Sequence, residues 1–459
     1  MAKPRENITQ HLIRDREFYL RVIAIVLPVA AQQAINMGVN MMDTIMLGQF
    51  GEIQLSASSL ANSFYQLFSI FCMGIIGGCS VLVAQFFGAK DMKQCRRTFT
   101  LAFQLSLGFA VVFALITWFF PEWIMRLFTQ EDAVVTAGVR YLKITAFIYV
   151  IHGTSLVMAS LMRSVRQPKL GLAVSIVSFF VNIFANWVFI FGKLGAPRME
   201  IAGAALGTLI ARFSEFLVTF IYILFMDKKL GLRIRDLFRR VPGALFAKYL
   251  KIGLPVLVSD SLLGFGNTTV SMILGRMGSN IVSANAICQV VDRLVTVVVS
   301  GVANAASITT GNIIGEGDEK KAYDAGVTFY LLAVTFGIVN GLIVMIIGPL
   351  SMRLYALTPE TIVITHQMMY AYAFITIFLN IQSVMTKGVL RGGGDTRFLM
   401  IADILFLWVV SIPLGYFAGI VLLAPAWVTI ICLKSESIIK SFWCINRLKS
   451  GKWIKNVTK

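Results

Sequence analysis

The sequence predicts an all-α polytopic membrane protein, with 12 transmembrane helices in two six-helix lobes related by pseudo-two-fold symmetry along the membrane normal. Two observations support this fold class. Of the 459 residues, 57% are hydrophobic and only 14% are charged, which excludes an ordinary soluble globule of this size. In addition, a long segment of the first half recurs in the second half.

Apolar stretches define the individual helices, because roughly 20 apolar residues cross about 30 Å of hydrocarbon as a helix. They lie at 20–47, 54–87, 98–120, 134–162, 170–191, 201–226, 249–275, 281–314, 324–350, 361–390, 398–417 and 424–444. Six fall in each half. We therefore predict an N-terminal six-helix lobe at 1–227, a cytoplasmic basic linker at 228–248, and a C-terminal six-helix lobe with a cytoplasmic tail at 249–459.

The repeat relates the two halves residue by residue. The segment Ile25–Lys93 returns 227 positions later as Ile252–Lys320 without a break in register, so that Gly88 corresponds to Gly315. Since each half has an even number of spans, both halves enter the membrane the same way up. The pseudo-two-fold axis then runs along the membrane normal. Halves that can close around a cleft are typical of transporters.

The net charge of +18 follows from topology. With a cytoplasmic N-terminus, 32 of the Lys and Arg residues lie in inner loops and tails and 7 in outer loops. This imbalance obeys the positive-inside rule and places both termini in the cytoplasm. Basic tails that bind a membrane surface or nucleic acid are the alternative interpretation. We expect the lipid bilayer as a partner and no nucleic acid.

Signatures of other protein classes are missing from the sequence. The first span is preceded by charges of both signs and has no cleavage site, so we expect it to be retained. The six cysteines lack metal-ligand spacing, and no nucleotide-binding or hydrolase motif occurs. We therefore expect no enzyme, no catalytic residue, no disulfide, no zinc site and no cofactor.

Polar side chains inside the first lobe indicate a site. One stripe lies on a single face of the first span, at steps of four, four and three, and consists of Gln32, Asn36, Asn40 and Asp43. An ionisable Asp43 within the membrane must face protein or a water-filled cavity. Further oxygen-bearing side chains in spans five and six are Asn182, Asn186 and Thr208. Such a set can hold a proton or a small hard cation such as Na⁺, and a structural polar network is the alternative.

The second lobe has a different set of polar residues, since Asp43 corresponds to Val270 in the repeat. Its acidic candidates, for which functional and structural roles both remain open, are Asp260, Asp292 and Asp403. The candidates for a substrate cleft across both lobes are Gln32, Asn36, Asn40, Asn267, Asn285 and Gln289. Arg212 and Glu215 have the spacing of a helical ion pair, for which we favour a structural role.

An ordered set of motifs resembles the multidrug and toxic compound extrusion (MATE) family. The motifs are Met42-Asp43-Thr44-Ile45-Met46-Leu47-Gly48, the Leu-Pro-Val tripeptides at 27–29 and 254–256, Asn182-(x)3-Asn186, Gly203-Ala204-Ala205 and Leu390-Arg391-Gly392-Gly393-Gly394-Asp395-Thr396. This resemblance implies two lobes around a central cleft, alternating access, and export of small-molecule organic cations driven by inward H⁺ or Na⁺. It implies a bacterial plasma-membrane protein, which we expect to be a monomer.

The resemblance also assigns roles to residues. It implies that Asp43 is the ion-coupling carboxylate and a possible ligand of Na⁺, and that Asn182, Asn186 and Thr208 line the same site. Asn186 departs from the family pattern, because some members carry an acid at this position. Asp260 resembles an acidic position of a bacterial subgroup, which implies a second-lobe site.

Two other classes of function stay open. A flippase for a lipid-linked sugar or peptidoglycan precursor shares the architecture, and would need a cationic cleft for the pyrophosphate. Twelve spans and acidic stripes argue against it. A receptor or scaffold that transports nothing would leave the acidic stripe dispensable.

Overall fold

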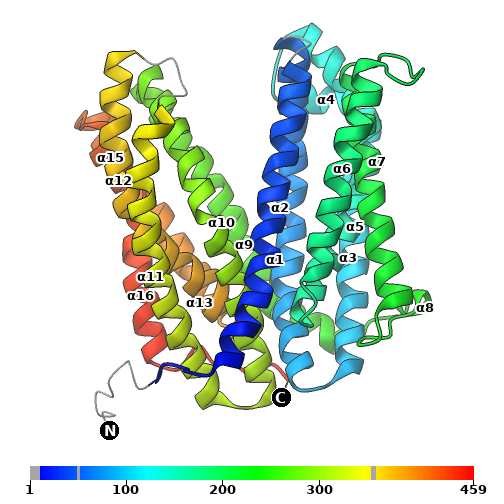
Figure 1. Cartoon of the computed structure of the whole chain (residues 1–459), viewed down its shortest axis with the longest axis vertical. Coiled ribbons are helices and arrows are strands. Elements are labelled where there is room, and N and C mark those ends of the chain that lie inside the picture. Colours follow the sequence, from blue (N-terminus) through cyan, green and yellow to red (C-terminus); the bar gives the residue numbers. More distant parts are fainter. Residues whose placement is uncertain (1–10, 49–51, 353–357, 459) are drawn as a thin grey trace. The chain divides into compact units, whose positions relative to one another are not determined.

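The structure of the chain is a computed structural model that describes residues 11–48, 52–352 and 358–458. Within these ranges all regular structure is helical (Figure 1). Four of the basic residues used in the topology prediction lie outside the described residues, namely Lys3, Arg5, Arg353 and Lys459. Contacts along the chain divide it into two compact units. The N-terminal unit comprises Ala31–Val83 and Asp91–Leu250, and the C-terminal unit comprises Met1–Ala30, Ala84–Lys90 and Lys251–Lys459.

The described part of the first half contains six long α-helices and two short ones. They are α1 (Arg16–Gly48), α2 (Glu52–Gly88), α3 (Met92–Phe119), α4 (Pro121–Arg126), α5 (Asp132–Ser164), α6 (Lys169–Phe191), α7 (Ile201–Ile221) with a π-helical end at Tyr222–Met226, and α8 (Ile234–Leu237). Local sequence explains several ends. The Asp91 side chain caps α3 by accepting a hydrogen bond from the backbone N–H of Gln94. Gly192 ends α6 at a φ of 69°, where a side chain would be strained.

The second half begins with three long helices and continues with broken ones. They are α9 (Gly243–Met277), α10 (Ser279–Glu316), α11 (Glu319–Met352), α12 (Pro359–Ser383) continued by a π-helix at Val384–Leu390, α13 (Thr396–Asp403), a π-helix at Ile404–Ser411, α14 (Ile412–Tyr416), a π-helix at Phe417–Val421, α15 (Ala426–Leu433) and α16 (Ser435–Lys449). The predicted all-α membrane fold is confirmed.

Eleven helical stretches of the described chain are long and apolar enough to cross a membrane. The twelfth predicted span, 424–444, is instead split at Lys434 into α15 and α16. Its two pieces have 8 and 15 residues, so neither alone reaches the length of roughly 20 residues that crosses the hydrocarbon.

In the N-terminal unit, helices α3, α5, α7 and α6 pack side by side in that order. Helix α3 packs on α5, α5 packs on α7, and α7 packs on α6. The pair α6 and α7 approaches closely because Gly203 has no side chain, and a Cβ there would collide with the Phe189 backbone. This arrangement places the polar faces of α5, α6 and α7 within one bundle.

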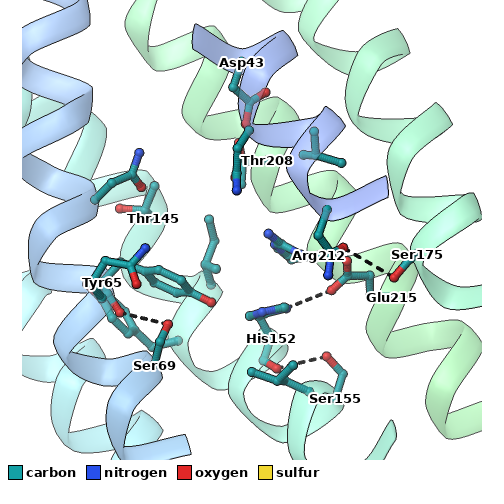
Figure 2. Close-up of a pocket in the computed structure, with 18 of the residues that line it drawn as sticks. Asp43, Tyr65, Ser69, Thr145, His152, Ser155, Ser175, Thr208, Arg212 and Glu215 are labelled. Carbon is teal, nitrogen blue, oxygen red and sulfur yellow. Dashed lines mark hydrogen bonds and ion pairs between the residues drawn. The ribbon is translucent and has the colours of Figure 1, made fainter. Parts of the chain in front are cut away.

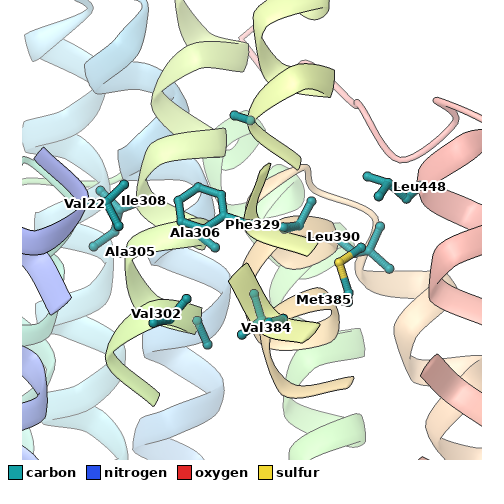
Figure 3. Packing of buried hydrophobic residues seen from close by; sticks show 14 of the residues in the cluster. Val22, Val302, Ala305, Ala306, Ile308, Phe329, Val384, Met385, Leu390 and Leu448 are labelled. Carbon is teal, nitrogen blue, oxygen red and sulfur yellow. The ribbon is translucent and has the colours of Figure 1, made fainter. Parts of the chain in front are cut away.

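The C-terminal unit has its own apolar core, which Figure 3 shows. Phe329 of α11 is fully buried there, together with Ala305 and Ala306 of α10 and Leu390 at the end of the α12 π-helix. The beginning of α1 joins this core through Val22. Small side chains on α10 let the neighbouring helices approach, as is usual where hydrocarbon surrounds a bundle.

Two repeat-related glycines make equivalent contacts in the C-terminal unit. A Cβ on Gly88 would collide with the Asn312 carbonyl, and a Cβ on Gly315 would collide with the Gln85 carbonyl. Both pairs differ by the 227-residue offset, since Gln85 corresponds to Asn312 and Gly88 to Gly315. The ends of α2 and α10 therefore contact each other through the same positions, which gives a steric reason for glycine in both copies.

Candidate functional site

Helices α1 and α6 meet at Asp43. The Asn186 side chain donates from Nδ2 to Asp43 Oδ1 over 2.6 Å, and the same nitrogen lies 3.3 Å from Oδ1 of Asn182, one turn earlier on α6. Both asparagines are buried. Among the residues that the structure describes, no cationic side chain forms an ion pair with Asp43. Its negative charge is thus held by neutral amide groups.

Helix α7 completes this group of side chains. A Cβ on Gly207 would collide with Asn186 Oδ1, so that α7 passes directly beside the α6 amide. That Oδ1 atom is buried and accepts no hydrogen bond within the described chain. The next residue, Thr208, lines the same cavity as Asp43, and its hydroxyl donates to the Ala204 carbonyl over 2.9 Å. The fold therefore brings the four predicted ion-site residues together.

A cavity of about 810 Å³ opens beside Asp43 within the N-terminal unit (Figure 2). Side chains of α1, α2, α5, α6 and α7 line it, and the entire polar stripe of α1 faces it, namely Gln32, Asn36, Asn40 and Asp43. Asn36 accepts a hydrogen bond from Ser175 over 3.4 Å, and Gln32 accepts one from Arg163 over 3.3 Å. The four polar residues of α1, which follow one another at steps of four, four and three, thus line one wall of the cavity.

The same cavity is lined by a group of three charged or polar side chains, of which the sequence predicted two. Glu215 accepts hydrogen bonds from Arg212 Nη1 over 2.7 Å and shares a 2.8 Å contact with His152 Nδ1. Figure 2 shows the three side chains pointing toward one another in the cavity, next to Tyr65. The predicted pair of Arg212 and Glu215 forms, with His152 as an additional member. No spacing rule links His152 to Glu215, because they lie on different helices. The only hint in the sequence was that each is an ionisable residue within an apolar span.

Comparison with known proteins identifies the family. The MatE family model matches residues 28–188 and 255–417, one match in each half of the chain. This chain belongs to the MatE family. It is therefore a membrane transporter rather than an enzyme, as the sequence predicted.

Several curated relatives match most of the MatE chain. A multidrug resistance protein NorM of Vibrio vulnificus is 24% identical over 406 residues, which cover 87% of both chains. The NorM of Vibrio cholerae is also 24% identical, over 399 residues and 87% of both chains. The uncharacterized transporter YisQ of Bacillus subtilis is 22% identical over 444 residues, which cover 96% of both chains.

Solved structures confirm the MatE fold. A MOP superfamily transporter from Pyrococcus furiosus, described as having a binding pocket of reverse polarity, matches with a TM-score of 0.83 and 18% identity. The match covers 98% of this chain and 100% of that one. A MATE structure in the straight conformation matches with a TM-score of 0.84 and 18% identity, over 98% and 100% of the two chains.

The acidic candidates in the second half of this MatE protein have different partners. Asp260 receives two hydrogen bonds from Arg391, at 2.9 and 3.4 Å. Asp403 accepts from Ser259 and pairs with Lys440 over 2.7 Å. Two of the three acids are thus paired with cations of the same unit.

Two of the remaining candidates of the second half form hydrogen bonds with neutral side chains. Asp292 accepts a hydrogen bond from Thr376 over 3.0 Å, and Asn285 accepts one from Tyr372 over 2.7 Å. Asn267 is exposed and Gln289 is half-buried. None of the residues predicted in the second half lines the cavity beside Asp43.

Proposed function

We propose that this MatE protein is a secondary active multidrug efflux antiporter, which exports organic cations or other toxic compounds in exchange for H⁺ or Na⁺ by alternating access. The observation that carries the proposal is the Asp43 carboxylate, which faces a cavity of about 810 Å³ and forms no ion pair within 4 Å in the described chain. Glu215 of the same cavity has Arg212 as its counter-ion. An unpaired carboxylate in a membrane attracts a proton or a cation.

The oxygen atoms around Asp43 suit either coupling ion. The carboxylate can accept a proton directly. For Na⁺, the carboxylate would be joined by the unpartnered Oδ1 of Asn186 and the hydroxyl of Thr208, both of which are hard oxygen donors. We assign no fixed cofactor, because the ion is carried as a substrate of the exchange.

Coupling requires that the ion and the organic cation favour different states. An ion that reaches Asp43 from outside would neutralise the carboxylate and thereby weaken its attraction for a cationic compound in the same cavity. The compound is then released outward, and the driving force cannot exceed the difference in the ion's affinity for the two states. The names of the NorM relatives, which describe multidrug resistance, support this substrate class.

The flippase alternative is less consistent with this cavity. A lipid pyrophosphate needs several uncompensated cations, whereas Arg212 is the one Lys or Arg side chain that lines the cavity beside Asp43 within the described chain, and Glu215 compensates it. We also propose that both termini are cytoplasmic and that the protein acts as a monomer in a bacterial plasma membrane, as the charge distribution and the family resemblance imply.

The test is transport of a dye cation in proteoliposomes, with a Na⁺ gradient and a pH gradient imposed separately. Wild-type protein should transport with one of the two gradients, and Asp43→Asn should abolish gradient-driven transport without loss of expression. The matched control is Asp318→Asn, since Asp318 caps α11 outside the cavity and asparagine caps equally well. Full transport by Asp43→Asn would contradict the proposal.

A further inference from the structure

A second cavity of about 430 Å³ lies in the N-terminal unit and shares no lining residue with the Asp43 cavity. It is formed where the beginning of α3 meets the linker that follows α8. Its lining consists of Lys93, Arg96, Arg97, Thr100, Asp236, Arg239, Arg240 and Val241. Five of these eight side chains are cationic and one is acidic, so the cavity is strongly basic.

The linker is held against α3 by side chains that bond to its backbone. The Thr100 hydroxyl donates to the Asp236 carbonyl over 2.9 Å. The Gln104 amide donates to the carbonyls of Leu237 and Arg239, over 3.1 and 2.8 Å. These three hydrogen bonds hold the segment that carries Arg239 and Arg240 against α3. The wall of the cavity is therefore fixed by the fold of the unit.

The positive charge of this cavity is largely uncompensated. Its one carboxylate, Asp236, already pairs with Arg239 over 3.0 Å and accepts from the Arg233 amide over 3.1 Å. Lys93, Arg97 and Arg240 form no ion pair among the residues that the structure describes. Guanidinium groups present forked N–H donors that match phosphate oxygens. The cavity therefore has the chemistry of a phosphate-binding site.

Apolar side chains next to the cavity indicate where its ligand comes from. Phe238, which directly precedes Arg239, is 68% exposed, and Ile234 on α8 is 55% exposed. The Phe238 ring also contacts Phe103 of α3 edge-on, with the centroids 5.8 Å apart. Exposed apolar groups beside basic ones, at the end of a membrane-spanning helix, are typical of a surface that contacts both headgroups and acyl chains.

We propose that this cavity binds the phosphate headgroup of an anionic phospholipid. Arg97, Arg240 and Lys93 hold the phosphate, and the acyl chains pass beside Phe238 and Ile234 into the bilayer. Basic pockets at the ends of membrane helices recognise anionic lipids in this way. The occupant is a lipid rather than free phosphate, because a soluble anion would gain nothing from the apolar neighbours. The inference is independent of the transported substrate and of the role of Asp43.

Native mass spectrometry of the detergent-purified full chain tests the proposal. Phosphatidylglycerol, phosphatidylcholine and inorganic phosphate are titrated separately. We expect wild-type protein to retain phosphatidylglycerol in preference to phosphatidylcholine, with no competition from millimolar phosphate. Arg97→Gln combined with Arg240→Gln should weaken phosphatidylglycerol binding roughly thirtyfold, because each Lys or Arg near anionic lipid raises the affinity about fivefold. Arg97→Lys combined with Arg240→Lys should retain most of the binding.

A matched control distinguishes this site from general basicity. Lys320→Gln combined with Lys321→Gln removes the same charge from exposed positions at the start of α11 that do not line the cavity, and should leave binding unchanged. Equal loss in this control, undiminished binding in the glutamine variant of the cavity, or displacement of the lipid by inorganic phosphate would each overturn the proposal.

Discussion

Asn186 donates a 2.6 Å hydrogen bond to Asp43, although the two residues are 143 positions apart. This contact joins α1 to α6 at the cavity wall, and it fixes the orientation of the carboxylate that we assign to ion coupling. The Asn186 oxygen remains without a partner in the described chain and lies beside Gly207. One amide thus bonds to the carboxylate through its nitrogen and places its oxygen against α7.

Replacement of Asn186 by alanine should impair coupling without unfolding the protein. The Asp43 carboxylate would lose the donor that orients it, and loss of such a supporting contact commonly costs about 10–100-fold in ion affinity or activity. Dye transport in proteoliposomes should therefore fall at least about tenfold. Asn280→Ala, which removes an exposed amide that bonds to Glu360, should transport normally. Wild-type rates in Asn186→Ala would exclude a supporting role for the amide.

The buried group of Arg212, Glu215 and His152 predicts a marked difference between single and paired substitutions. Glu215→Gln would leave the Arg212 charge without its counter-ion, at a cost of about 3–5 kcal/mol. Arg212→Met combined with Glu215→Leu removes both charges and should recover most of this loss. Thermal unfolding in detergent measures both variants. A single variant as stable as wild type would show that the ion pair is not required for stability.

Gly88 and Gly315 should be equally intolerant of a side chain, because they occupy equivalent positions in the contact between α2 and α10. Gly88→Ala or Gly315→Ala would place a methyl group against a backbone carbonyl and should destabilise the protein by about 1–3 kcal/mol. Gly108→Ala on α3 is the control, since nothing lies within 4 Å of the added methyl group. Similar melting temperatures for all three variants would refute the steric explanation.

The C-terminal tail should detach when Trp453 is removed. Trp453 is fully buried, and a Cβ on Gly393 would collide with its ring. Trp453→Ala should cost about 3–5 kcal/mol of local packing and expose the tail to limited proteolysis. Trp427→Ala, at a position that is 41% exposed, is the matched control. Equal protease resistance in both variants would argue against anchoring by Trp453.

Periodicity in the sequence predicted that the polar residues of α1 lie on one side of the helix, because residues at helical spacing must share a face. The α1 stripe from Gln32 to Asp43 lines a cavity as a unit. Partners from other helices could not be predicted, since their contact depends on how the helices pack. His152 joins Glu215 across 63 positions, and Lys440 joins Asp403 across 37, without any local pattern.

The amino-acid sequence alone determined that the protein lies in a membrane, how many apolar stretches it has, that its two halves are repeats, and its family. These properties follow from composition, periodicity and register. Tertiary structure decided which charges are compensated. Asp260 and Asp403 form direct ion pairs, and Asp43 forms none among the described residues. An ion pair depends on distances of a few ångströms between helices, and only their packing sets those distances.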